Sequence, residues 1–208
     1  MEFNYITLFS IYISSLMVIS HASSPISSSI KTTTSSSPHS SITSLVNDLK
    51  TINSNIPEKV IEACKTTDFP SECSSSVAPL LLDGKSEPLD ILQGQAKALT
   101  HALEIAKENI DSLKSEVKKE QTILTCKQMY ENAKGEISKA MELASRNDKY
   151  GVNVYFSGAI TFIETCKDEL PKDLKNDSTI ILVNNLLSNL ASNCLALGNF
   201  AMGLHVHN

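Results

Sequence analysis

The sequence predicts an all-α protein, an up-down-up-down four-helix bundle preceded by an N-terminal helical hairpin and held by two disulfides. Three observations predict this fold. The chain has 82 residues without proline, the strongest helix breaker, between Pro88 and Pro171. Apolar residues recur at alternating steps of three and four through four segments. Five cysteines, of which four can pair, follow an N-terminus that predicts secretion into an oxidising compartment.

Residues 1–22 predict a secretory signal peptide. The run from Ile6 to Ile19 carries only Ser, Thr and Tyr as polar residues, and the small residues Ser20 and Ala22 suit signal peptidase. The alternative is a membrane anchor, but the apolar run is shorter than the about 20 residues that a membrane span needs. We therefore expect a secreted, extracellular protein that does not associate with a membrane after cleavage, and we expect no later stretch to span a bilayer.

Residues 23–44 predict a disordered linker. Fifteen of these 22 residues are Ser or Thr, and Pro25 and Pro38 interrupt them. A segment with so few apolar residues cannot bury a core. The remaining residues, 45–208, are long enough for one helical domain, with the hairpin at about 57–84 and the bundle at about 88–204.

The hairpin is expected to consist of two short helices, at about 57–66 and 70–82. Pro57 and Pro70 each stand where a first helical residue would be, and a proline there loses no helical hydrogen bond. Asp83-Gly84 is expected to end the second helix.

Four longer amphipathic helices are expected to form the bundle, with turns at 118–121, 146–151 and 168–178. Their apolar residues alternate steps of three and four, which places them on one face of each helix. The expected inward-facing residues are Leu89, Leu92, Ala96, Leu99, Leu103, Ala106, Ile110, Leu113 and Val117; Ile123, Cys126, Tyr130, Ala133, Ile137, Ala140 and Ala144; Val152, Tyr155, Ala159, Phe162 and Cys166; and Val183, Leu187, Leu190, Cys194, Leu197, Ala201 and Leu204.

The cysteines fit this arrangement in two ways. Cys126 and Cys166 fall on the inward faces of neighbouring antiparallel helices, so a bridge between them is geometrically reasonable. Cys64 and Cys73 lie on the two short helices, where a bridge would staple a hairpin that is too small to hold itself together. Four cysteines allow three connectivities, so the residues alone leave the pairing open.

Cys194 is the cysteine left over. It is either a reactive or intermolecularly bridged thiol, or a buried thiol that behaves as a small apolar side chain. Its position among inward-facing leucines favours the buried free thiol.

Catalytic and nucleic-acid-binding patterns are not evident. The formal net charge is −5, and it becomes −4 when residues 1–22 are removed because Glu2 is their only charged residue, so no nucleic-acid footprint is expected. His101 is the only internal histidine of the helical part, and its helical position predicts a solvated flank. Glu131 and Glu136 fit the outer face of a helix better than a hydrolytic carboxylate pair. We expect no enzyme, no cofactor and no metal site.

The sequence Asn176-Asp177-Ser178 is an N-glycosylation sequon within the expected connection at 168–178. A connection before the last helix is exposed, so this sequon predicts glycosylation of Asn176 in a secreted protein.

The chain from about residue 57 to 204 resembles the plant invertase/pectin methylesterase inhibitor family. The order and spacing of four cysteines within the helices carry the resemblance. The similar segments are Ala63 to Cys73, Cys126 to Ala133, Ser157 to Thr161, Thr165 to Glu169, and Leu186 to Leu197.

The resemblance implies the pairs Cys64–Cys73 and Cys126–Cys166. It also implies a non-enzymatic inhibitor that acts in the apoplast and cell wall, and that forms a 1:1 complex over the active-site cleft of a secreted pectin methylesterase or acid invertase. Invertase-directed members can carry Pro-Lys-Phe near the last helix, whereas Pro171-Lys172 are followed here by Asp173. This difference favours pectin methylesterase. A non-inhibitory secreted helical binding module is the alternative of another class.

Overall fold

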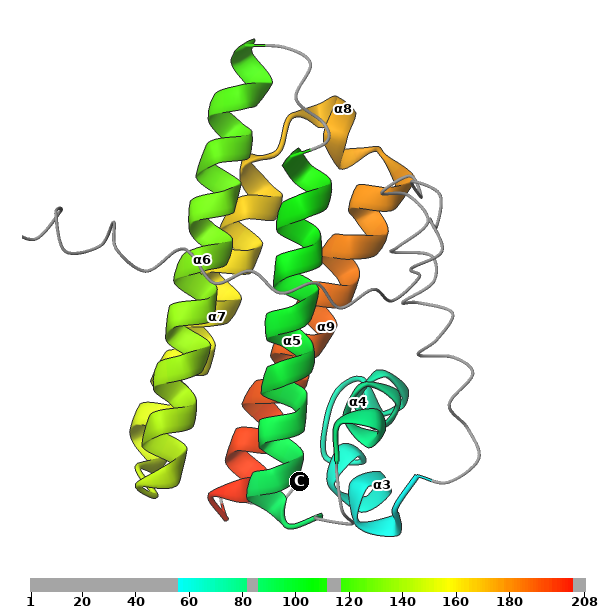
Figure 1. The fold of residues 1–208 in the computed structure, drawn as a ribbon, viewed down its shortest axis with the longest axis vertical. Coiled ribbons are helices and arrows are strands. Elements are labelled where there is room, and N and C mark those ends of the chain that lie inside the picture. The colour runs from blue at the N-terminus through cyan, green and yellow to red at the C-terminus, as the bar shows by residue number, and fades with distance from the viewer. Residues whose placement is uncertain (1–55, 82–85, 112–116, 204–208) are drawn as a thin grey trace, which may run out of the picture. The chain divides into compact units, whose positions relative to one another are not determined.

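The computed structural model describes residues 56–81, 86–111 and 117–203 (Figure 1). The expected signal peptide (1–22) and linker (23–44) lie outside the described residues, as do Asp83-Gly84, Leu113 and Leu204. The described part is helical and contains no strand. It confirms the predicted all-α class.

The hairpin consists of α3 (Glu58–Cys64), α4 (Pro70–Val77) and the 3-10 turn η1 (Ala78–Leu80). Pro70 is the first residue of α4, as expected, whereas Pro57 is the N-cap residue before α3. The prediction that the second helix continues to residue 82 is wrong. Pro79 lacks the N–H that an α-helix would use, so the chain tightens into a 3-10 turn there.

The bundle consists of α5 (Pro88–Asp111), α6 (Val117–Ser145), α7 (Lys149–Glu169) and α9 (Ser178–Ala201). Each of these helices packs on two others: α6 packs on α5 and α7, and α9 packs on α7 and α5. The one-turn helix α8 (Lys172–Lys175) occupies the connection between α7 and α9. This is the predicted up-down-up-down bundle.

Two predicted turns differ from the structure. Residues 118–121, expected as a turn, belong to α6, which begins at Val117. Lys, Glu and Gln have high helix propensities, and no Gly or Pro interrupts them, so the charged sequence continues the helix. The connection expected at 168–178 contains α8, and α7 continues into it as far as Glu169.

Two helix ends carry side-chain caps. Asp148 accepts a hydrogen bond from the Gly151 backbone N–H at 2.9 Å and caps α7. Asp177 accepts bonds from the N–H groups of Thr179 at 2.8 Å and Ile180 at 3.1 Å and caps α9. Asn147, in the turn before α7, has φ of 56°, a conformation that Asn tolerates better than most residues. The Asp148 cap and the Asn147 conformation fix the turn between α6 and α7, and the Asp177 cap fixes the start of α9.

Most of the expected inward-facing residues are buried. On α6, all seven from Ile123 to Ala144 are buried. On α7 the expected Val152, Ala159 and Cys166 are buried, but Tyr155 and Phe162 are half-buried. Phe156 and Ile163 are buried in place of those two aromatic residues. On α5, Leu89 is 40% exposed in the first turn, contrary to expectation.

The helix α9 has the length and hydropathy of a membrane span, contrary to the expectation that no stretch after residue 22 has them. Half of its apolar window is buried inside the protein, where it packs against α5 and α7. Asn184 and Asn193 are buried on the same helix. We interpret α9 as the core helix of the bundle.

Candidate protein-binding surface

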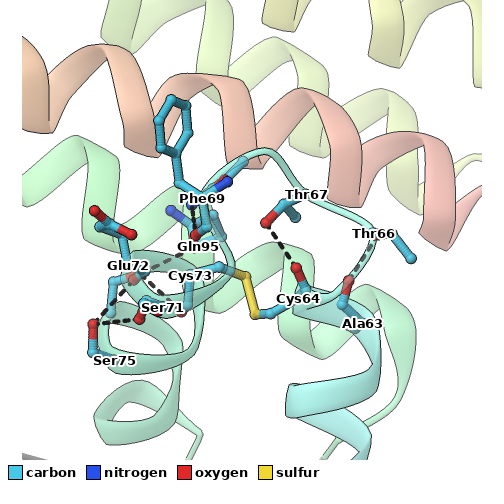
Figure 2. Close-up of a disulfide and its surroundings, with 12 residues drawn as sticks. Ala63, Cys64, Thr66, Thr67, Phe69, Ser71, Glu72, Cys73, Ser75 and Gln95 are labelled. Carbon is cyan, nitrogen blue, oxygen red and sulfur yellow. Dashed lines mark hydrogen bonds between the residues drawn. A yellow bond between two sulfur atoms is a disulfide. The ribbon is translucent and has the colours of Figure 1, made fainter.

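The hairpin is closed by the disulfide Cys64–Cys73, whose Cα atoms lie 5.6 Å apart (Figure 2). The hydroxyl of Thr67 donates to the Cys64 carbonyl at 2.8 Å, and that of Thr66 donates to the Ala63 carbonyl at 2.7 Å. The same two carbonyls also accept the backbone N–H groups of Thr66 and Thr67 at 3.1 Å, so each threonine bonds its carbonyl twice. The disulfide and the two hydroxyls together fix the turn between α3 and α4.

A buried amide attaches the hairpin to the bundle. The side chain of Asn193 on α9 has no exposed surface. Its Oδ1 accepts from the Phe69 N–H at 3.3 Å, and its Nδ2 donates to the Phe69 carbonyl at 3.1 Å. Beside it, Ser192 donates to the Asp68 carboxylate at 2.8 Å. The hairpin turn is therefore held on α9 through its backbone.

A second buried amide lies between the hairpin and two bundle helices. Gln95 on α5 has no exposed surface and is drawn close to Phe69 and Cys73 in Figure 2. It accepts from the Ser76 hydroxyl at 3.0 Å, and its Nε2 donates to the Leu190 carbonyl at 3.3 Å. The hairpin thus packs on α5 and α9, and α6 and α7 form the other side of the bundle (Figure 1).

The pair α6–α7 is fixed near both ends. The disulfide Cys126–Cys166 joins the two helices, with Cα atoms 4.7 Å apart and 40 residues of separation in sequence. The capped turn at residues 146–148 joins them at the other end. All four bridged cysteines are fully buried. We call the outer face of α6 and α7 the candidate surface, because the disulfide holds the two helices together and the face lies away from the hairpin. Its residues include Glu131, Glu136, Ser138, Glu142, Thr161, Glu164 and Thr165.

The edge of this surface toward α5 carries interhelical ion pairs. Glu131 is bonded to Lys107 of α5 and lies 3.6 Å from Lys134, which in turn is 3.1 Å from Glu104 of α5. The hydrogen bond from Lys107, with the charge of Lys134, lowers the pKa of Glu131. The hydrogen bond to Glu104 raises the pKa of Lys134.

Two more carboxylates of the surface have cationic partners. Glu142 lies 2.8 Å from Lys139 and 2.6 Å from Arg146, and the hydrogen bond from Lys139 is the main cause of its lowered pKa. Burial opposes the ionisation of Glu164, but hydrogen bonds from Lys167 and Ser188 outweigh it and lower the pKa. Both side chains are thus held as carboxylates near neutral pH.

The helices α6 and α7 also carry hydroxyl side chains that bond within their own helix. The hydroxyls of Ser138, Thr161 and Thr165 each donate to the carbonyl four residues earlier in the same helix, at 2.7 to 2.9 Å. Their protons are therefore used within the protein, and their oxygen lone pairs remain available as acceptors. The surface offers acceptors and carboxylates to a partner.

The other residues singled out from the sequence lie apart from this surface or inside the core. Cys194 is a free, fully buried thiol on α9, and burial raises its pKa. Asn176 is exposed at the C-cap of α8, and His101 is exposed on α5. Among the described residues, no three His, Cys, Asp or Glu side chains are grouped as metal ligands would be.

The two buried amides, Gln95 and Asn193, are residues that the sequence did not single out. Asn193 lies in an apolar stretch of α9, whereas Gln95 stands among polar residues and one helical turn after Leu92. A polar residue at an inward position signals a buried hydrogen bond, but its partner comes from a segment far away in sequence.

A sequence model of the family described as plant invertase/pectin methylesterase inhibitor matches residues 58–197, which is more than half of the chain. A mutant form A of a pectin methylesterase inhibitor from Arabidopsis has a similar structure, with a TM-score of 0.56 and 18% identity over 69% of this chain and 97% of that one.

A pectin methylesterase inhibitor from Arabidopsis thaliana gives a TM-score of 0.50 with 18% identity, over 69% of this chain and 95% of that one. At this identity the two likenesses show the shared fold. No curated protein sequence matches the chain. The match of the family model over the hairpin and the bundle places the chain in the plant invertase/pectin methylesterase inhibitor family.

Proposed function

We propose that this protein is a secreted inhibitor of pectin methylesterase that binds over the active-site cleft of the enzyme in a 1:1 complex and so modulates cell-wall pectin. Family membership over residues 58–197 is the observation that carries this proposal. Both structural relatives are pectin methylesterase inhibitors, which supports the choice of target.

The rigidity of the candidate surface supports inhibition by direct coverage. A bundle joined by Cys126–Cys166 and by the Asp148 cap presents its outer face with little further ordering. Association then loses less conformational entropy than it would with a mobile loop. Helical backbones of this kind usually change little on binding, so the free surface approximates the bound one.

Acid invertase is the second candidate target, because the family model covers invertase inhibitors as well. Asp173, in the short helix α8, follows Pro171-Lys172 where invertase-directed members can carry Phe. An acidic residue instead of an aromatic one removes a hydrophobic contact at that position. This difference supports pectin methylesterase as the first candidate.

The test is a parallel titration of the secreted, oxidised protein against a plant pectin methylesterase and an acid invertase. We expect the esterase to lose activity at an equivalence point of one inhibitor per enzyme, and the invertase to stay active. Inhibition of invertase alone would reassign the target. Full activity of both enzymes would overturn the proposal in favour of a non-inhibitory helical binding module.

The proposal includes extracellular localisation and a three-part chain: a signal peptide at 1–22, a linker at 23–44 and the inhibitor domain at 45–208. It also includes N-glycosylation at Asn176, which is supported by the exposure of this side chain. Expression in plant cells, followed by mass spectrometry of the medium, tests these points together. We expect a mature N-terminus at Ser23 and a glycan that Asn176→Gln removes.

A further inference from the structure

The glutamates of α6 and α7 differ in whether a cation of the same protein pairs with them. Glu131, Glu142 and Glu164 each have a cationic partner within the protein. Glu136 on α6 has no ion pair or hydrogen bond with any side chain that the structure describes. No cation of the described bundle pairs with its carboxylate.

The cations nearest to Glu136 along α6 are already engaged. Lys134 is bonded to Glu104 and also contacts Glu131. Lys139, one turn after Glu136 on the C-terminal side, is bonded to Glu142 at 2.8 Å. A carboxylate flanked by engaged lysines is open to a cation that comes from outside the chain.

The position of the Glu136 carboxylate depends on Gly158 of α7. A Cβ atom at residue 158 would lie 2.6 Å from Oε2 and 3.2 Å from Cδ of Glu136. The end of the Glu136 side chain thus occupies the space that a side chain at 158 would fill. The carboxylate therefore packs against Gly158 of the facing helix α7, and both residues are half-buried.

The residue before Glu136 points to a partner as well. Gly135 is exposed, and a Cβ atom there would meet nothing within 4 Å. By contrast, a Cβ at Gly94 would lie 3.2 Å from Val77, and one at Gly198 would lie 3.0 Å from Val152. Glycine inside a helix costs about 1 kcal/mol relative to alanine. Packing within the protein accounts for Gly94 and Gly198 but not for Gly135, whose bare backbone leaves room beside Glu136.

We infer that Glu136, seated on Gly158, is the anionic anchor of the candidate surface and binds an arginine or lysine side chain of the target enzyme. This inference rests on the proposed function. An ion pair that becomes buried at the interface gains from the low dielectric only if its geometry is good. The contact with Gly158 positions the carboxylate before the partner binds, so binding costs little side-chain conformational entropy.

The test compares three variants of the full secreted protein in binding to whichever of the two enzymes the wild type inhibits. Glu136→Gln removes the charge with almost no change of shape. Gly158→Ala keeps the charge but displaces the carboxylate. Glu87→Gln is the matched control, because it removes one exposed carboxylate that is paired with Lys59, away from α6 and α7.

We expect Glu136→Gln to raise the inhibition constant about 10-fold or more, mainly because the complex dissociates faster. Gly158→Ala should also weaken it, and Glu87→Gln should change it less than about 2-fold. Thermal unfolding of each variant checks that the fold is kept; Glu136→Gln should unfold at the wild-type midpoint, since the carboxylate has no partner to lose.

Equal inhibition by the wild type and Glu136→Gln would overturn this inference and leave the proposed function intact. Equal losses in Glu136→Gln and Glu87→Gln would overturn it too, because they would report net charge alone. If the wild type inhibits neither enzyme, the proposed function fails and the inference fails with it.

Discussion

Asn193 is a single residue on which the position of the hairpin depends. It is fully buried and bonds both the N–H and the carbonyl of Phe69. The amide carries its donor and its acceptor on separate atoms, so it can bond a backbone carbonyl and a backbone N–H at the same time. These hydrogen bonds fix the position of the hairpin turn on α9, and an apolar side chain could not form them.

Replacing Asn193 by alanine leaves the Phe69 N–H without its partner, whereas the Phe69 carbonyl keeps the hydrogen bond from the Cys73 N–H at 2.9 Å. An unsatisfied buried group costs about 1–3 kcal/mol, so we expect Asn193→Ala to lower the free energy of unfolding by an amount in that range. Urea unfolding measures it. Ser192→Ala serves as the control, because it removes only the exposed bond to Asp68 and should cost less than about 1 kcal/mol. Equal effects of the two variants would contradict the role of Asn193.

Gly135 gives a prediction of opposite sign. A Cβ atom fits at this exposed helical position without contact, so Gly135→Ala should raise the free energy of unfolding by about 0.5–1 kcal/mol. Gly198→Ala is the matched control, since its Cβ would lie 3.0 Å from Val152, and it should not stabilise the protein. Denaturant unfolding of both variants checks this; a destabilised Gly135→Ala would contradict it.

At the scale of the element, the sequence predicts that the helices exist more reliably than it predicts where they end or which of their residues face the core. On α6 the alternating spacing of three and four residues passes through Cys126, Tyr130 and Ala133. All three are buried. On α7 the same spacing can be laid through Tyr155 or through Phe156. Both residues are aromatic, and only packing against α6 and α9 decides which one is buried.

The two disulfides should contribute unequally to stability. In the chain-entropy model the contribution grows with the loop that is closed, which spans 9 residues for Cys64–Cys73 and 40 for Cys126–Cys166. The model gives about 2.5 and about 4 kcal/mol. We expect replacement of both cysteines by alanine to destabilise the protein more for the α6–α7 pair than for the hairpin pair. Urea unfolding of the two double variants tests the order, and the reverse order would contradict it.

At the scale of the whole molecule, the carboxylates with cationic partners predict sensitivity to acid. The pKa values of Glu131, Glu142 and Glu164 are lower in the folded protein than the usual value of 4.5. A group with a lowered pKa stabilises the fold above the unfolded pKa, and this stability is lost as the pH falls through the folded value. The midpoint temperature of thermal unfolding should therefore decrease as the pH is lowered below about 4.5.

Glu131→Gln provides the check on this acid effect. The variant cannot gain a proton at residue 131, so its midpoint should depend less on pH between 5 and 3 than that of the wild type. An identical pH dependence in the two proteins would show that the pair with Lys107 does not contribute to the acid sensitivity.

The sequence could predict the bundle but not the candidate surface as a set of interactions. Helical periodicity and the cysteines on α6 and α7 were sufficient to predict that these two helices are neighbours. The distinction between Glu136 and Glu131 depends on which cations of other helices come within reach. That information lies in contacts across 22 to 30 residues, such as Glu136 with Gly158 and Lys134 with Glu104, and no local pattern contains it.

Coverage of the active-site cleft is the central claim, and competition with substrate tests it most directly. The inhibition of pectin methylesterase by the full secreted protein would be measured at several pectin concentrations. If the protein covers the cleft, the apparent inhibition constant rises in proportion to pectin, and saturating pectin restores the maximal rate. A maximal rate that stays depressed at saturating pectin, with an unchanged KM, would place the binding site elsewhere on the enzyme and contradict the claim.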